Sequence, residues 1–161
     1  NKKLNGEFYM SKQWNVGVNH MPAYQISGVP FVTSSAADEV PQEDELSDPG
    51  NKTLKITFPY VTKFFQIQNK SASNRVLQVG FSAEGANGNI EKTGGVGAAD
   101  QGPRFFTVRA NETSSIYNLR TKELFFSCQG GAGAVTVIAG LTMIETGSFP
   151  TLTSSLEFRG V

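Results

Sequence analysis

The sequence predicts an all-β protein that folds as an antiparallel β-sandwich, and three of its features lead to this prediction. From residue 50 onward, apolar side chains recur at every second position, which is the period of a strand with one buried face. No stretch of ten or more residues carries an apolar stripe at the helical period. Turn-forming residues separate the alternating runs at short intervals, as they do in sandwiches and barrels.

The alternating runs and the turns between them define the strands in order. Leu54, Ile56 and Phe58 alternate with polar neighbours before the break at Pro59, and the last long run alternates from Val135 to Met143. Turn chemistry follows at residues 71–74, 110–113 and 129–133. Eight strands in a sandwich fit a single jelly roll, which contains two Greek keys. The strands are expected near residues 29–33, 54–58, 61–68, 75–82, 104–109, 115–120, 122–128 and 134–144, with a ninth, weaker one near 152–158.

The apolar faces of these strands predict the core. Adjacent phenylalanines such as Phe64–Phe65 and Phe125–Phe126 point to opposite faces of a strand, so one member of each pair can fill the core. The other member stays on the outer face, where a loop of the same chain or another subunit would cover it. Eight core residues are predicted: Leu77, Val79, Phe81, Leu124, Phe126, Val135, Val137 and Leu141.

The length of 161 residues suggests one compact domain, and the distribution of charge subdivides the chain. Residues 1–50 are interpreted as an N-terminal arm and acidic loop, and residues 51–161 as the jelly-roll domain, which the strand near 29–33 can join. Residues 38–48 carry six acidic groups and no basic one, which is typical of a solvated loop. The arm is expected to become ordered by wrapping a neighbouring subunit. Residues 83–103 hold six glycines and predict one long loop.

The composition argues against most site chemistry. Lysine plus arginine equals aspartate plus glutamate at 14 each, so nucleic-acid binding through phosphate neutralisation is not expected. The one histidine, His20, and the one cysteine, Cys128, have no partners at a catalytic or metal-binding spacing. The glycine clusters at 94–97 and 130–133 lack the lysine of a phosphate-binding loop. No catalytic, cofactor-binding or metal-binding residue is therefore predicted, and the protein is not expected to be an enzyme.

Three further features of the sequence are interpreted without assigning a function to them. Residues 124–144 are uncharged and long enough to span a bilayer, but their polar residues and glycines favour two core strands joined by a turn, so no membrane span is predicted. The first twelve residues hold no apolar core of a signal peptide, so secretion is not expected. Three Asn-x-Ser/Thr sequons, at Asn51, Asn69 and Asn111, are accordingly interpreted as chance matches.

Five stretches of packing residues together resemble one family. The stretches are GVPFVTSS at 28–35, ITFPYVTKFF at 56–65, LQVGFS at 77–82, LRTKELFF at 119–126 and IAGLT at 138–142. This series is similar to the small single jelly-roll penton, or vertex, proteins of large icosahedral double-stranded DNA viruses, most of all the algal-virus-like ones. The resemblance covers about residues 28–144 and involves no catalytic signature.

The resemblance implies a structural virion protein without a cofactor. It implies a homopentamer that closes the capsid at a fivefold vertex, with the major capsid protein and possible minor capsid proteins as neighbours. Two alternatives stay open. One is a carbohydrate- or receptor-binding sandwich, such as a fibre head or lectin-like module, which would stack sugars on loop aromatics such as Trp14 or Tyr60. The other is a minor capsid or cement protein with the same fold at a different location.

Overall fold

The structure, a computed structural model, describes residues 29–42, 53–86 and 104–149. The elements in these ranges are strands apart from the short helix α1 and one 3-10 helix, so the all-β prediction is confirmed. The predicted strand near 152–158 lies outside the described residues. The elements are β1 (Val29–Ser34), β2 (Leu54–Thr57), β3 (Tyr60–Asn69), β4 (Val76–Gly80), α1 (Ala83–Ala86), β5 (Phe105–Val108), β6 (Glu123–Gln129), β7 (Val135–Glu145) and the 3-10 helix Thr146–Ser148.

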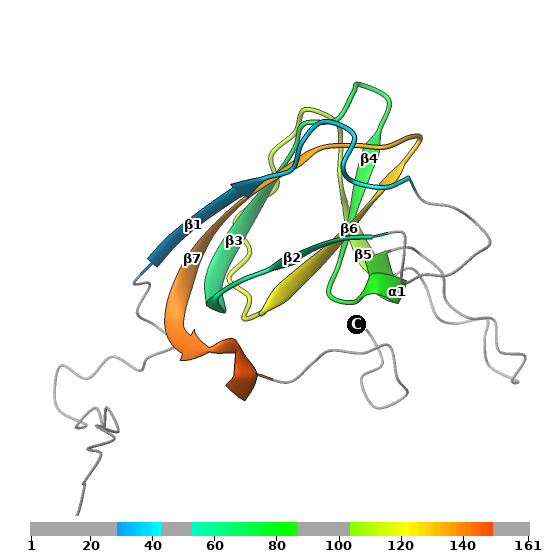
Figure 1. Cartoon of the computed structure of the whole chain (residues 1–161). Helices are drawn as coiled ribbons and strands as arrows, with labels where there is room; N and C mark the ends of the chain where they lie inside the picture. The colour runs from blue at the N-terminus through cyan, green and yellow to red at the C-terminus, as the bar shows by residue number, and fades with distance from the viewer. Residues whose placement is uncertain (1–28, 43–52, 87–103, 150–161) are drawn as a thin grey trace, which may run out of the picture.

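The strands form two antiparallel sheets that pack face to face (Figure 1). One sheet has the order β1-β7-β3 and the other the order β2-β6-β4-β5. The pairing is nested along the chain, because β1 pairs with β7, β2 with β6, and β4 with β5. The edge of β3 that faces away from β7 is joined by residues 112–121, which occupy the place of an eighth strand. Nested pairing of eight segments in two sheets is the connectivity of a single jelly roll.

The prediction of a regular strand at residues 115–120 is wrong. In place of a continuous ladder with β3, this stretch and the residues before it form isolated bridges, Phe65 to Tyr117 and Gln68 to Thr113. Side-chain hydroxyls take over positions of the ladder here: the Ile67 N–H donates to Ser114 Oγ at 3.0 Å, and the Thr121 N–H donates to Thr62 Oγ1 at 3.0 Å. Serine and threonine hydroxyls compete with backbone partners in this way, and regular pairing is lost.

The core between the sheets largely matches the predicted one. Phe58, Phe65 and Ile67 join it from β3 and the turn before it. Seven of the eight predicted core residues are completely buried: Leu77, Val79, Leu124, Phe126, Val135, Val137 and Leu141.

The eighth residue, Phe81, is only half-buried, which corrects the prediction for it. The ladder of β4 ends at Gly80, because the chain bends there and α1 folds back over the end of the strand. Phe81 therefore stays on the core side but at its margin, where it meets Phe65 edge-on with ring centroids 6.4 Å apart. The same bend means that the predicted loop 83–103 begins as a helical turn, and its residues 87–103 lie outside the described ones.

The adjacent phenylalanines divide between the two faces as predicted. Phe65 and Phe126 are fully buried, whereas Phe64 and Phe125 are half-buried on the outer faces. The ammonium group of Lys55 lies 5.4 Å from the centroid of the Phe125 ring, so part of the cover on this side comes from the same chain.

The alternation predicted for β7 breaks near its end. Met143 was expected on the core face and is 49% exposed, while Thr142 is fully buried and donates its hydroxyl to the Val61 carbonyl at 2.7 Å. The pairing with β3 shifts register twice, between Tyr60 and Thr62 and between Thr62 and Phe64. Such irregularities re-aim side chains, so the period of two does not continue through them.

Residues 124–144 form β6, a glycine turn and β7, as predicted for this uncharged stretch. Within the part of the chain that the structure describes, no helix has the length and apolar character needed to cross a membrane.

We expect truncation of Phe126 to destabilise the protein far more than truncation of Phe81. Phe126 is fully buried, so Phe126→Ala should lower the free energy of unfolding by about 3–5 kcal/mol. Phe81→Ala should cost clearly less, because that ring is already half-exposed. Urea denaturation of both variants measures the difference, and equal costs would contradict the assignment of Phe81 to the margin of the core.

We also expect Gly80→Ala to be destabilising by about 1–3 kcal/mol, the usual effect of overpacking. A Cβ atom at residue 80 would lie 2.6 Å from the backbone nitrogen of Ala86, so α1 would have to move. The matched control is Gly147→Ala, where a Cβ would meet nothing within 4 Å. Thermal unfolding of both variants tests this, and a control that loses as much stability as Gly80→Ala would refute the steric explanation.

Candidate functional site

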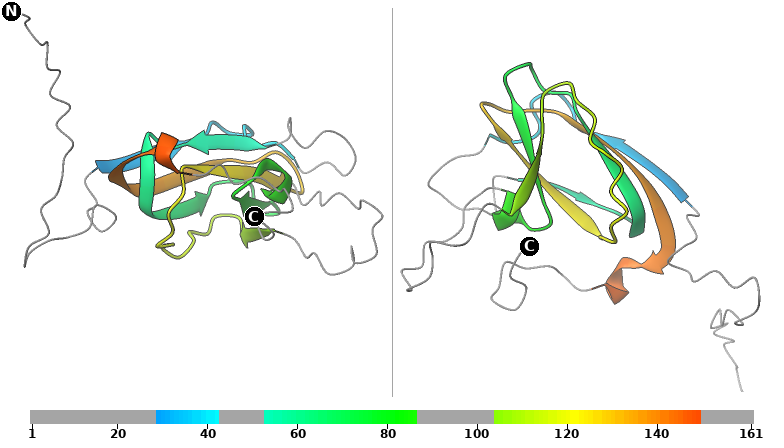
Figure 2. Two further views of the ribbon diagram at one scale, coloured as in Figure 1. Left: turned by 90° about the horizontal axis from the view of Figure 1, so that it is seen from below. Right: turned by 180° about the vertical axis from the view of Figure 1, so that it is seen from behind.

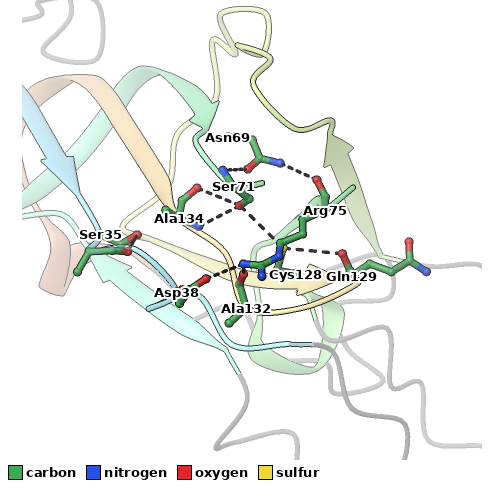
Figure 3. A network of polar contacts seen from close by, with 10 residues as sticks. Ser35, Asp38, Asn69, Ser71, Arg75, Cys128, Gln129, Ala132 and Ala134 are labelled. Atoms are coloured by element: carbon green, nitrogen blue, oxygen red, sulfur yellow. Dashed lines mark hydrogen bonds and ion pairs between the residues drawn. The ribbon is translucent and has the colours of Figure 1, made fainter. Parts of the chain in front are cut away.

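One end of the sandwich gathers four connections of the chain. Polar contacts tie together four segments from separate parts of the sequence, residues 35–41, 70–75, 109–112 and 129–134, and Figure 3 shows part of this network. We call these four segments the loop end. Its geometry determines how rigidly this part of the surface is held.

The amide of Asn69 is the centre of the loop end. Asn69 is fully buried at the last position of β3. Its side-chain nitrogen donates to the Val108 carbonyl at 2.9 Å and to the Arg75 carbonyl at 3.3 Å, while its oxygen accepts from the Ser71 N–H at 2.9 Å. One side chain thus joins the ends of β3 and β5 to the start of β4.

Ser71 connects this centre to the turn before β7. Its hydroxyl accepts from the Ala134 N–H at 2.9 Å, and a Cβ atom on Gly133 would clash with the same oxygen. Residue 133 therefore has to be glycine for the two segments to approach this closely.

Arg75 fixes the outer rim of the loop end. Its guanidinium pairs with the carboxylate of Asp38 at 2.5 Å and also donates to the Ala132 carbonyl. The Asp38 side chain is 66% exposed, so the ion pair itself contributes little stability. Its effect is mainly to hold the turn after β1 beside the turn before β7.

The acidic stretch is not entirely the solvated loop that its composition predicts. Val40 is fully buried in the core, and its N–H and carbonyl pair with Gly133 at 2.9 and 2.8 Å. The Pro41 carbonyl accepts from the Cys128 N–H at 2.9 Å. One apolar residue and its backbone thus anchor residues 40–41 to the loop end, while residues 43–48 lie outside the described ones.

The structure describes one of the two reactive candidates of the sequence, Cys128. His20 lies outside the described residues. Cys128 is fully buried beside Ser71, and burial raises the pKa of its thiol, so the thiol stays protonated at neutral pH. Among the described residues, no group of three or more His, Cys, Asp or Glu side chains could hold a metal ion.

Of the remaining candidates, the structure describes Tyr60, Asn69 and Asn111. Tyr60 is half-buried and packs against the core, whereas Trp14 and the sequon at Asn51 lie outside the described residues. The Asn69 sequon is buried, and Asn111 is exposed in a turn with a φ of 60°.

The second notable surface is the outer side of the β1-β7-β3 sheet, together with residues 113–119 along β3. We call it the neutral face. Val32 of β1 pairs with Ile138 of β7, which pairs with Gln66 of β3. Tyr117 pairs with Phe65 and packs inward, so its neighbour Ile116 continues the same row outward. The apolar members of this row are 66%, 43% and 58% exposed for Val32, Ile138 and Ile116.

The neutral face is almost free of charge. β1 and residues 113–119 hold no charged side chain, β7 carries only its terminal Glu145, and β3 carries only Lys63. The next row across the face consists of Pro30, Gly140 and Phe64. Exposed apolar side chains without charges among them are typical of a surface that contacts another protein.

The outer side of the β2-β6-β4-β5 sheet differs from the neutral face, because it is partly covered and carries charged side chains. Helix α1 lies on it, where Ala86 is fully buried and its carbonyl accepts from the Ser127 hydroxyl at 2.5 Å. Lys55 and Glu123 form an ion pair on it at 2.6 Å. Of the two outer sides, the neutral face is therefore the better candidate for a binding surface.

Sequence reasoning missed the key residues of both surfaces. Asn69 and Arg75 stand at strand ends where polar residues are ordinary, and only the pairing of the strands brings them to Ser71 and Asp38. Ile138 was assigned to a buried strand, since a continuous apolar run does not reveal which face is covered.

Comparison with known proteins supplies no relative for this chain: no family model, curated protein or solved structure matches it.

We expect Asn69→Asp to destabilise the protein strongly although the side chain keeps its size. The Val108 and Arg75 carbonyls would lose their donor, and each unsatisfied buried group costs about 1–3 kcal/mol. The matched control, Asn118→Asp, changes an exposed residue and should stay within about 0.5 kcal/mol of the parent. Urea denaturation compares them, and a mild effect of Asn69→Asp would mean that Asn69 does not hold the loop end together.

Proposed function

We propose that this protein is a structural capsid protein, a single jelly-roll penton that forms a homopentamer at the fivefold vertices of an icosahedral virion. The observation that carries the proposal is the neutral face: three exposed β-branched side chains in one row across four adjacent segments, without charges among them. Exposing such apolar side chains to water costs free energy, and contact with another subunit removes this cost by burying them.

The fold supports the proposal without requiring it. Jelly rolls occur in viral capsids, lectins and cupins, so the connectivity alone does not select a function. The resemblance to penton proteins across residues 28–144 favours the capsid class over lectins and cupins. The described packing residues that carry this resemblance lie in or beside the strands.

The loop end suits a role at a symmetry axis. Five copies in a closed ring repeat one heterologous interface, and the segments nearest the axis must hold the same shape in every copy. The contacts of Asn69, Ser71 and Arg75 hold four connections in one arrangement before any neighbour arrives. In the proposed ring the loop end faces the axis, and the major capsid protein surrounds the outer margin.

The carbohydrate-binding alternative has less support. Tyr60 packs against the core, so its ring is not free to stack on a sugar. A minor capsid or cement role would use the same fold and the same surfaces, and differs only in where the protein sits in the particle.

Copy number and location test the proposal. Native mass spectrometry of the full chain should show a pentamer, and a density map of the particle should place it at the vertices. Ile138→Lys should lower the pentamer fraction, since it puts a charge in the neutral face. The control Thr107→Lys changes an exposed residue of β5 on the other sheet and should leave the pentamer intact.

Three results would overturn it. A monomer that binds glycans would favour the lectin-like alternative, and density away from the vertices would favour the minor capsid or cement alternative. Pentamers that tolerate Ile138→Lys as well as Thr107→Lys would remove the neutral face from the argument.

A further inference from the structure

The strand β1 has an open edge beside the neutral face. It is the terminal strand of the order β1-β7-β3, and it forms the outer border of its sheet in Figure 1 and in the right-hand view of Figure 2. Within the described ranges, no strand lies beyond it. An unpaired edge presents a row of backbone donors and acceptors to any extended segment that reaches it.

The register shows which groups face this edge. The Ser35 N–H donates to the Val135 carbonyl at 2.9 Å, so these two residues form a hydrogen-bonded pair. Because such pairs alternate in an antiparallel ladder, the odd residues of β1 bond to β7 and the even ones point outward. Pro30 falls on an outward position and lacks an N–H, so Val32 and Ser34 supply the outward N–H donors of β1.

The chain itself contains a segment whose chemistry matches this surface. Residues 13–28 directly precede β1 and hold no Asp, Glu, Lys or Arg, whereas residues 1–12 hold four charged side chains. Trp14, Val16 and Val18 alternate with Asn15, Gly17 and Asn19, which is the pattern of a short strand with one apolar face. An uncharged segment can be buried on an uncharged face without the cost of desolvating a charge.

We propose that residues 13–28 of one copy dock on a neighbouring copy, with residues 14–18 lying along the open edge of β1 and their apolar side chains on the neutral face. This inference rests on the self-assembly in the proposed function and adds the identity of the segment that each neighbour contributes. Val32 and Ile138 are the central contacts on the receiving copy.

A neighbouring copy suits the chain better than the same copy does. Docking within one copy would require residues 19–28 to form a ten-residue hairpin loop, whereas hairpin loops usually have two to five residues. Extended, those ten residues span about 33–36 Å, comparable with the diameter of a small domain, so they reach an adjacent subunit. Each copy gives one segment and receives one, which closes a ring.

Cross-linking between two differently tagged full-length chains tests the docking. One chain carries Val16→Cys and the other Ile138→Cys, and they are assembled together and treated with a short bis-maleimide. Cys128 is fully buried with a raised thiol pKa, so the parent chain should give no cross-link. We expect a covalent dimer that contains both tags. Pairing Val16→Cys with Thr107→Cys, on the other sheet, should give at least tenfold less.

A second measurement does not depend on cysteine geometry. Trp14→Asp and Val32→Lys should each weaken self-association at least tenfold, read as the midpoint of dissociation on dilution, while Lys12→Asp should change it less than twofold. Circular dichroism confirms that each variant keeps its strands. Unchanged association in both test variants would overturn the proposal.

The outcomes separate this inference from the proposed function. The absence of any two-tag cross-link to Ile138→Cys in an intact pentamer would overturn docking on a neighbour and leave the penton proposal standing. A chain that carries both Val16→Cys and Ile138→Cys would overturn it as well if it cross-linked only within itself and gave no covalent dimer. A two-tag cross-link in an assembly that is not a pentamer supports the docking and removes the penton.

Discussion

The tight turn between β6 and β7 is the constraint on which the rest of the sandwich depends. β6 lies between β2 and β4, and β7 lies between β1 and β3, so each pairs on both sides, and residues 130–134 are all that connects them. Gly130 and Gly131 have φ values of 88° and 138°, which other residues rarely adopt, and Gly133 leaves room for Ser71. Because β1 and β3 pair with β7, and β2 and β4 with β6, the geometry of this turn fixes how the two sheets lie on each other.

The loop end shows how such an arrangement is made specific. An apolar core tolerates small slips of one sheet over the other, but the amide of Asn69 has three backbone partners at fixed directions, two in residues 70–75 and one at the end of β5. Moving any of them would leave a buried polar group unpaired, which costs more than a lost apolar contact. The rigidity that the proposed ring needs near its axis therefore has a source within one subunit.

Much of the fold could be predicted from the sequence, because a strand with one buried face has an apolar residue at every second position. That signal placed β2, β4, β6 and β7 within a few residues and identified most of the core. It failed at 115–120, where the hydroxyls of Ser114 and Thr62 replace ladder partners, since the pattern of apolar residues does not show what the backbone bonds to.

The errors at Phe81, Met143 and Val40 have local geometric causes. The bend after β4 limits the burial of Phe81. The register shifts against β3 expose Met143, and the pairing with Gly133 anchors Val40 in the core, and both of these depend on segments distant in sequence. The neutral face could not be predicted from the sequence, because it also depends on contacts between distant segments. Val32, Ile138 and Ile116 come from three separate parts of the chain, and only the strand order makes them neighbours.

The burial of Asn69 also makes the fold sensitive to modification of the chain before it folds. Asn69-Lys70-Ser71 is an acceptor sequence for oligosaccharide transfer, and an unfolded chain would expose it fully. A sugar attached to that nitrogen could not enter the space in which the amide contacts Val108 and Arg75. Native folding thus requires this asparagine to stay unmodified, so a ribosome delivering the chain into a glycosylating compartment would set sugar transfer and closure of the sandwich in competition.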